Sequence, residues 1–172
     1  AAAAATRHRS ALPRLETARL VLRAPTLDDF PVWLGLFEDG SFDGGAERAW
    51  EEFCVYTAGW LLHGHGLLAV TLRDGTVAGF VLLGLEWDDP EPELGWMLAP
   101  EHRGQGYATE AARALRDHGL SLLPDLFSFI RADNAASVRV AERLGATRVP
   151  SPFPDAVAFR HGAAPTSPET PS

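Results

Sequence analysis

Lysine is absent from this sequence, and all 15 of its positively charged residues are arginine. Schiff-base catalysis and the Walker phosphate loop both need a lysine amine, so pyridoxal-type enzymes and ordinary P-loop nucleotide hydrolases are excluded. The net charge is −8. Nucleic-acid binders depend on a basic surface, so we expect no nucleic-acid partner and favour a cationic or neutral substrate.

Cysteine is nearly absent as well. The single Cys54 cannot form an internal disulfide, and one thiol with scattered histidines does not make a zinc site, so we expect a reducing compartment and no bound metal. Cys54 lies in the apolar-rich run 50–60, and we expect its thiol to be buried.

Long apolar runs are missing too. None approaches the roughly 20 residues that a membrane span needs. The alanine run at the start is followed by positive charge, which is the reverse of a secretory signal. We therefore expect a cytoplasmic protein that does not act at a membrane.

The length and composition fit one globular domain. The chain has 172 residues, of which 46% are hydrophobic and 22% charged. Residues 1–11 are rich in alanine and residues 163–172 in proline, serine and threonine, so both are expected to be flexible extensions. The domain is predicted to span residues 12–162, without internal repeats.

Hydrophobic periodicity predicts the order of helices and strands. Apolar runs predict strands at 19–23, 67–72, 77–85, 93–98, 126–131 and 156–160. Helical spacing predicts helices at 30–36 behind a Thr26 cap, at 46–62, at 107–122, and from Asp133 or Asn134 to Gly145. Asp74-Gly75 between two strands indicates a hairpin. This order predicts a mixed α/β sandwich with a partly parallel sheet.

Two of these helices have a predicted buried face. In the second helix it comprises Trp50, Phe53, Cys54, Thr57 and Leu61. In the third it is made of small or apolar residues, Ala108, Ala111, Ala112, Leu115, Gly119 and Leu122, which would let the helix pack closely on a sheet.

Residues 94–111 read as strand, glycine-rich turn and helix. A turn containing Gly104 and Gly106 can point backbone N–H groups inward, and the start of the following helix adds unpaired amides and a positive dipole end. Such a turn can hold a pyrophosphate without lysine. The alternative is a tight turn in which glycine only supplies backbone freedom. A complete Rossmann glycine motif is absent, because Thr109 occupies the third glycine position.

Three segments resemble the GNAT acetyltransferases. Residues 103–108, Arg-Gly-Gln-Gly-Tyr-Ala, match the family's Gln/Arg-x-x-Gly-x-Gly/Ala motif, whose amides hold the pyrophosphate of CoA. Residues 134–145 resemble the distal segment, in which an Asn begins a helix beside the pantetheine arm. Residues 15–23, together with Ser137, are similar to the branch that contains ribosomal-protein N-terminal acetyltransferases.

The resemblance, which covers about residues 15–145, implies the GNAT fold. That fold has a mixed, mostly antiparallel central sheet, helices on both faces, and a splayed pair of parallel strands at the CoA site. It also implies acetyl-CoA as cosubstrate, no metal, and direct attack by the amine without an acyl-enzyme. The cofactor-binding residues would be Met97, Leu98, Arg103, Gly104, Gln105, Gly106, Tyr107, Ala108, Thr109 and Asn134. A bulge near Gly95 would free the N–H of Met97 or Leu98 to polarise the thioester carbonyl.

Glu93 and Ser137 are the catalytic candidates. An alkyl amine is mostly protonated at neutral pH, so a base must remove a proton, and Glu93 precedes the strand that lines the acetyl site in this family. Its side chain faces either the cleft or solvent. Weaker candidates are Glu86, Asp88, Asp89, His63 and His65, which lie in predicted loops.

The chemistry also needs a group that protonates the leaving thiolate. Many relatives carry a tyrosine for this step on the distal helix, but Ala141 stands there. Ser137 is then expected near the sulfur, as a hydrogen-bonding partner more readily than as an acid.

The acceptor stays open at this level. The function expected is acetyl transfer to a primary amine, which is either a protein N-terminus or a small molecule such as a polyamine, an antibiotic or a metabolite. A CoA-binding module without catalysis is the rival class, given the missing tyrosine. The five tryptophans are compatible with a homodimer, although core packing explains them equally well.

Overall fold

The computed structural model describes residues 2–40, 44–87 and 89–162. The predicted tail 163–172 and Asp88 lie outside the described residues. In chain order the elements are α1 Ala2–Arg9, β1 Leu15–Glu16, β2 Leu20–Arg23, the 3₁₀ turn η1 Leu27–Asp29, α2 Phe30–Glu38, α3 Gly45–Leu62, β3 Leu67–Leu72, β4 Val77–Gly84, β5 Glu93–Leu98, the 3₁₀ turn η2 Pro100–His102, α4 Tyr107–Gly119, β6 Leu126–Arg131, α5 Ala135–Arg143, β7 Thr147–Val149 and β8 Ala156–His161.

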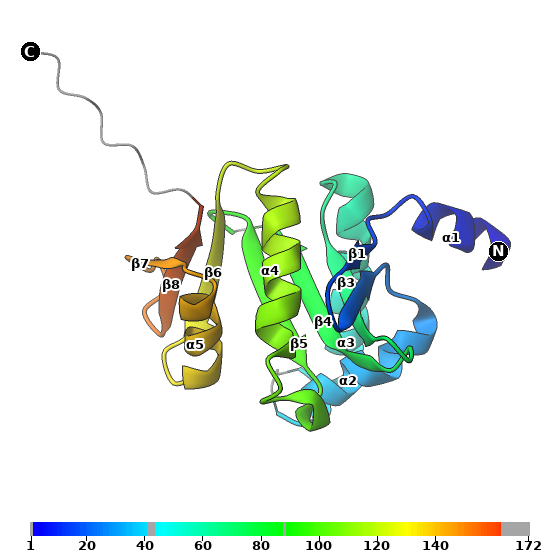
Figure 1. Ribbon diagram of the computed structural model, residues 1–172, viewed down its shortest axis with the longest axis horizontal. Helices are drawn as coiled ribbons and strands as arrows, with labels where there is room; N and C mark the ends of the chain where they lie inside the picture. The colour runs from blue at the N-terminus through cyan, green and yellow to red at the C-terminus, as the bar shows by residue number, and fades with distance from the viewer. Residues whose placement is uncertain (1, 41–43, 88, 163–172) are drawn as a thin grey trace, which may run out of the picture.

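An eight-stranded sheet runs through the protein in the order β1-β2-β3-β4-β5-β6-β8-β7 (Figure 1). Neighbouring strands are antiparallel except for β5 and β6, which are parallel. The mixed, mostly antiparallel sheet predicted from the sequence is therefore confirmed. The edge strands β1 and β7 were not predicted, because two or three residues carry too little hydrophobic pattern to be distinguished from loop.

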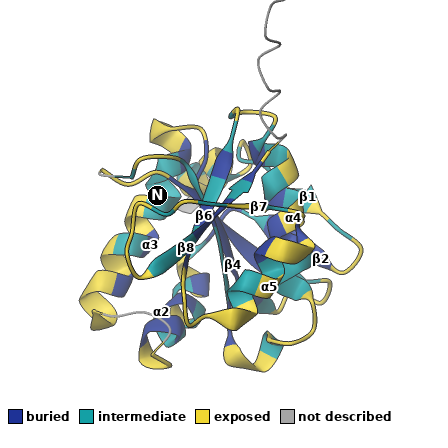
Figure 2. Ribbon diagram, turned by 90° about the vertical axis from the view of Figure 1, so that its left-hand side faces the viewer, coloured by how far each residue is buried: buried dark blue, intermediate teal, exposed yellow. Residues whose placement is uncertain are grey.

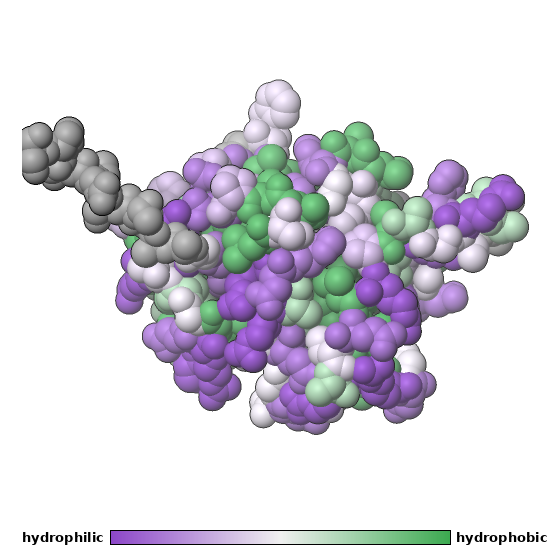
Figure 3. All heavy atoms as spheres, turned by 45° about the horizontal axis from the view of Figure 1, so that its top comes forward, coloured by the Kyte–Doolittle hydropathy of each residue, from purple (hydrophilic) through white to green (hydrophobic). Residues whose placement is uncertain are grey.

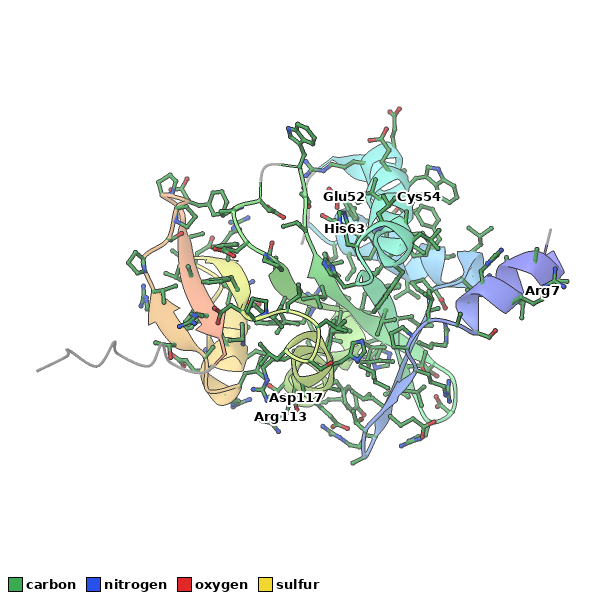
Figure 4. The ribbon with its side chains drawn as sticks, turned by 90° about the horizontal axis from the view of Figure 1, so that it is seen from above. Arg7, Glu52, Cys54, His63, Arg113 and Asp117 are labelled. Atoms are coloured by element: carbon green, nitrogen blue, oxygen red, sulfur yellow. The ribbon has the colours of Figure 1, made fainter. Side chains whose placement is uncertain are left out.

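Helices cover both faces of the sheet. Figure 4 shows Arg113 and Asp117 of α4 on one side of the strands, and Glu52 and Cys54 of α3, with His63 just after it, on the other. One core cluster joins α4 to the sheet through Ala111, Ala112 and Leu115. A second joins α2 and α3 to the opposite face, through Trp33 and Phe53. The strands between the helices are the most deeply buried part of the molecule (Figure 2).

Helix α4 packs on the sheet through the small residues that the spacing predicts. Ala111, Ala112, Leu115 and Gly119 are buried. A Cβ at Gly119 would lie 2.8 Å from Leu83 and 2.9 Å from Leu126, so glycine permits this close approach. The helix ends at Gly119, three residues before the predicted end, because the following N–H groups fold back on the Gly119 carbonyl as a turn. Leu122 is consequently exposed.

The buried face of α3 was predicted correctly at Phe53 but wrongly at Trp50, Cys54 and Leu61. The structure buries Ala49, Phe53 and Trp60, whereas Trp50, Leu61 and Cys54 are exposed. The two possible faces differ by a rotation of one residue, about 100°. The Trp33 indole, which donates to Ala49 O at 2.8 Å, helps to select the face that turns inward.

His65 also departs from expectation. It was placed in an exposed loop with His63, but its ring is buried, and its Nδ1 lies 2.7 Å from Leu83 O. The segment that contains His65 lies against β4, where Leu83 N donates to Gly66 O at 3.1 Å. The two residues are too far apart in the sequence for a local pattern to reveal this contact.

On the face shown in Figure 3, hydrophilic residues divide the apolar surface into separate patches.

Candidate active site

The strands β5 and β6 separate soon after they meet. Their register holds a single pair, Glu93 with Phe127, joined by the bond from Phe127 N to Pro92 O at 2.9 Å. Beyond this pair the strands diverge and border a cavity of about 840 Å³, which is also lined by α3, α5 and the turn before α4. The splayed parallel pair predicted from the resemblance is present.

The sequence predicted a bulge near Gly95, but the opening between β5 and β6 does not come from one. The pairing of β4 with β5 is continuous over six residue pairs, from Gly84 with Glu93 to Gly79 with Leu98. The backbone of β5 is therefore regular on its β4 side. It is the loss of pairing with β6 that exposes its other side to the cavity.

This regularity separates Met97 from Leu98 as carbonyl-polarising donors. Ala99 N–H donates towards β4, to Ala78 O, whereas Leu94 O faces β6. Since successive backbone groups of a strand point to alternate sides, Leu98 N–H faces the opening towards β6 and Met97 N–H faces β4. The geometry favours Leu98.

The glycine turn before α4 borders the cavity through Gly104 and Gly106. Both have left-handed backbones, with φ of 74° and 81°, and Gly106 is the residue immediately before the helix. Arg103 holds the turn, because its guanidinium donates to Leu98 O at 2.9 Å and to Asp39 Oδ2 at 2.6 Å. The Arg103 side chain is therefore committed to protein contacts beside the cavity.

Glu110 anchors the first turn of α4 to the start of the domain. Its carboxylate accepts from Thr17 Oγ1 at 2.6 Å, from Arg19 N at 2.9 Å and from Arg19 Nε at 2.7 Å. The Arg19 guanidinium also donates to Gln105 O at 3.0 Å and lies over the Tyr107 ring at 4.6 Å. These contacts tie the turn to the β1–β2 side. Gln105 and Tyr107 are not among the cavity-lining residues.

The other predicted residues meet at the cavity. They are Glu93, Met97, Leu98, Arg103, Gly104, Gly106, Ala108, Thr109, Asn134 and Ser137. Asn134 caps α5, since its side-chain oxygen accepts from Ser137 N at 3.0 Å. Ala141 is fully buried, so the position of the missing tyrosine is filled by core packing.

Arg139 and Arg143 on α5 also line the cavity and were missed in the sequence. Their spacing of four residues puts them on one side of the helix. That four-residue spacing of two arginines on a predicted helix was the pattern from which a positively charged helix face could have been predicted.

Glu93 is half-buried, on the face of β5 that looks towards α2 and α3. Burial raises its pKa to about 7, and the negative charges of Asp89 and Glu86 add to this shift. The nearby backbone of Phe129 acts on this pKa in the opposite direction. The side chain therefore titrates near neutral pH inside the cavity.

Acidic groups surround the same end of the cavity. Glu86 and Asp89 follow β4, and Glu52 lies on α3, where it pairs with Arg48 at 2.6 Å. The Tyr56 hydroxyl on α3 donates to Glu86. Burial and this bond raise the pKa of Tyr56, which keeps the hydroxyl protonated. Tyr56 carried no motif, and only the fold brings it to the site.

A family model for the acetyltransferase (GNAT) domain matches residues 19–147. The protein therefore belongs to the GNAT acetyltransferase family. An acetyltransferase structure from Agrobacterium tumefaciens strain C58 is 35% identical, covers 88% of this chain and 95% of its own, and has a TM-score of 0.80.

Three further proteins are similar over a shorter stretch or at lower sequence identity. The uncharacterised protein YkkB of Bacillus subtilis is 46% identical over 55 residues, so the chain spans only 32% of its length. RimL, a ribosomal L7/L12 α-N-protein acetyltransferase, shares the fold at 16% identity and TM-score 0.71, over 88% of this chain and 95% of its own. Spermidine N-acetyltransferase from Vibrio cholerae, solved with CoA and spermine, also shares the fold, at 19% identity and a TM-score of 0.66. The match covers 84% of this chain and 94% of that protein.

Within 2–40, 44–87 and 89–162, no three His, Cys, Asp or Glu side chains are grouped to hold a metal ion. In the same part of the chain, no helix is long and apolar enough to cross a membrane.

Proposed function

We propose that this protein is an acetyl-CoA-dependent N-acetyltransferase, in which a primary amine attacks the thioester directly in a ternary complex. The observation that carries the proposal is the position of Glu93. Its carboxyl group, with a pKa of about 7, lies in the cavity where β5 and β6 part, between the glycine turn and the acidic end.

The cavity offers complementary groups for the cosubstrate. The amides around Gly104 and Gly106 and the start of α4 suit a pyrophosphate, because helix N-termini favour anions. Arg139 and Arg143 add positive charge on the opposite wall. The thioester arm would then follow the exposed side of β5, with its carbonyl near Leu98 N–H.

The proposed chemistry needs little more than position and one base. Near neutral pH a substantial fraction of Glu93 is ionised and able to accept a proton from the ammonium form of the substrate. Leu98 N–H would stabilise the developing oxyanion. Ser137 lies on the α5 wall as a hydrogen-bonding partner for the sulfur.

The acidic end of the cavity supports a cationic acceptor. Glu52, Glu86, Asp89 and Glu93 all line the cavity, and of these Glu52 pairs with Arg48. An amine that arrives protonated is attracted by this charge. A protein N-terminus and a small-molecule amine both satisfy the requirement, and both kinds of acceptor occur among the proteins that share the fold.

Thiol release tests the proposal. The protein is mixed with acetyl-CoA and a panel of amines that includes N-terminal peptides, polyamines and aminoglycosides, and free CoA is followed over time. We expect amine-dependent release that is largely lost in Glu93→Gln. Tight CoA binding without release for any amine would support the inert binding module instead.

A further inference from the structure

Ser128 lies at the point where the β5–β6 ladder ends. After the bond from Phe127 N to Pro92 O, a regular parallel ladder would continue with Leu94 N–H to Phe127 O and then Phe129 N–H to Leu94 O. That last bond is replaced. Leu94 O accepts instead from Ser128 Oγ at 2.6 Å. A side chain thus satisfies the backbone carbonyl that strand pairing would have used.

His161 on β8 makes a second hydrogen bond with the Ser128 hydroxyl. Its Nε2 lies 2.9 Å from Ser128 Oγ, and both side chains are 1% exposed. The serine has one proton, which it gives to Leu94 O, so it must accept from Nε2–H. The histidine is then the Nε2–H tautomer. Burial and the nearby Arg116 lower the pKa of His161 to about 4, which keeps the ring neutral at physiological pH.

The hydrogen bonds from His161 to Ser128 and from Ser128 to Leu94 O allow β5 and β6 to separate without leaving the Leu94 carbonyl unpaired. An unpaired buried carbonyl costs roughly 1–3 kcal/mol, and without Ser128 the cheapest remedy is for Leu94 O to take Phe129 N–H. The ladder would then extend by two residues, or roughly 6.6 Å of strand. This extension would narrow the cavity between Glu93 and Phe129, which both line it.

We propose that Ser128, oriented by His161, is the positioning residue that ends the β5–β6 ladder and holds open the slot for the thioester arm. The inference rests on the proposed function, because the slot is assigned to that arm. Neither residue touches the reacting atoms in this assignment. Their effect is on the backbone of β5 and on the placement of Glu93.

A comparison of two ligands tests the role. CoA carries the pantetheine arm, whereas 3′-phospho-ADP is the same molecule without it. In calorimetry with the intact protein, Ser128→Ala should weaken CoA binding about tenfold or more, the equivalent of about 1.4 kcal/mol. Binding of 3′-phospho-ADP should stay within about twofold of wild type, because the glycine turn is untouched.

Thr71→Val is the matched control. Thr71 is buried on β3 and donates through its hydroxyl to Val21 O at 2.9 Å, so the variant removes a comparable bond away from the cavity. It should lose a similar amount of stability and bind both ligands normally. If it shows the same selective loss of CoA, a general weakening of the sheet explains the result and the inference fails.

His161 provides a second test if Ser128→Ala does not fold. His161→Leu should show the same selective loss of CoA affinity, whereas His161→Gln keeps an N–H donor near the position of Nε2 and should restore it. Wild-type affinities in folded Ser128→Ala or His161→Leu, or equal weakening of both ligands, would overturn the inference. A wild-type protein that binds neither ligand would instead contradict the proposed function.

Discussion

The hydroxyl group of Tyr56 on α3 donates a hydrogen bond to the carboxylate of Glu86, which lies 30 residues further along the chain. The bond joins the segment after β4 to α3 at the acidic end of the cavity. Glu86 N in turn donates to Asp89 Oδ2 at 2.7 Å, so one contact orders two of the acidic groups that face Glu93.

Tyr56→Phe should therefore raise the KM for the amine several-fold and leave acetyl-CoA affinity unchanged. The phenyl ring keeps the packing, and only the bond to Glu86 is lost. Steady-state kinetics on Tyr56→Phe, Glu86→Gln and the double variant measure the coupling between the two residues. Additive effects would show that the bond does not position the acceptor.

Gly106→Val should abolish measurable CoA binding in calorimetry. Its φ of 81° disfavours any side chain, and a Cβ there would lie 3.4 Å from Arg19 Nη2, so valine would shift the turn that is proposed to hold the pyrophosphate. Gly75→Val is the control, since Gly75 has a φ of 93° in the β3–β4 hairpin, with open space around it. Both variants should lose stability. Only Gly106→Val should lose CoA, and normal affinity there would remove the turn from the binding site.

Asn134→Ala should weaken acetyl-CoA binding by more than the loss of a helix cap explains. The cap alone accounts for about 1 kcal/mol of folding stability. Asn134→Ser retains a capping oxygen, so it should recover the melting temperature without recovering the affinity. If CoA affinity follows the melting temperature in both variants, Asn134 is a cap and nothing more.

Glu93→Gln should lower turnover by about 10²- to 10⁴-fold near neutral pH, with little change in acetyl-CoA affinity. Glutamine keeps the size of the side chain and cannot accept the proton. Wild-type turnover should rise as the pH passes through about 7, because the base works in its ionised form. The variant should lack this rise, and its deficit should shrink towards pH 10, where the free amine predominates.

Glu91→Gln is the control for that experiment, since Glu91 is exposed two residues earlier. It should retain the wild-type profile. A wild-type rate for Glu93→Gln from pH 7 to 10 would make Glu93 a bystander and move attention to Glu86.

The same residue predicts a change in stability. The folded pKa of Glu93, about 7, lies above the ordinary value of 4.5, so the folded state holds the proton more tightly. The contribution of Glu93 to the free energy of unfolding is therefore fully present below pH 4.5 and is lost as the pH rises through about 7. Glu93→Gln removes this loss, and its melting temperature at pH 8 should equal or exceed that of wild type.

The sequence by itself determined the order along the chain of all the strands but β1 and β7, the glycine turn, the small-residue face of α4 and the family. Each of these is a local pattern, because periodicity and turn chemistry act between residues a few positions apart. The same patterns placed ten of the twelve candidate site residues at the cavity.

The tertiary structure alone decided the rest. It selected which of two adjacent faces of α3 is buried, brought Tyr107 under Arg19 and the Gln105 side chain to Glu101 O, and buried His65. It also brought Tyr56 to Glu86 and His161 to Ser128, and surrounded Glu93 with groups that raise its pKa. These relationships join residues tens of positions apart, and their energies depend on distance and burial, which no local pattern encodes.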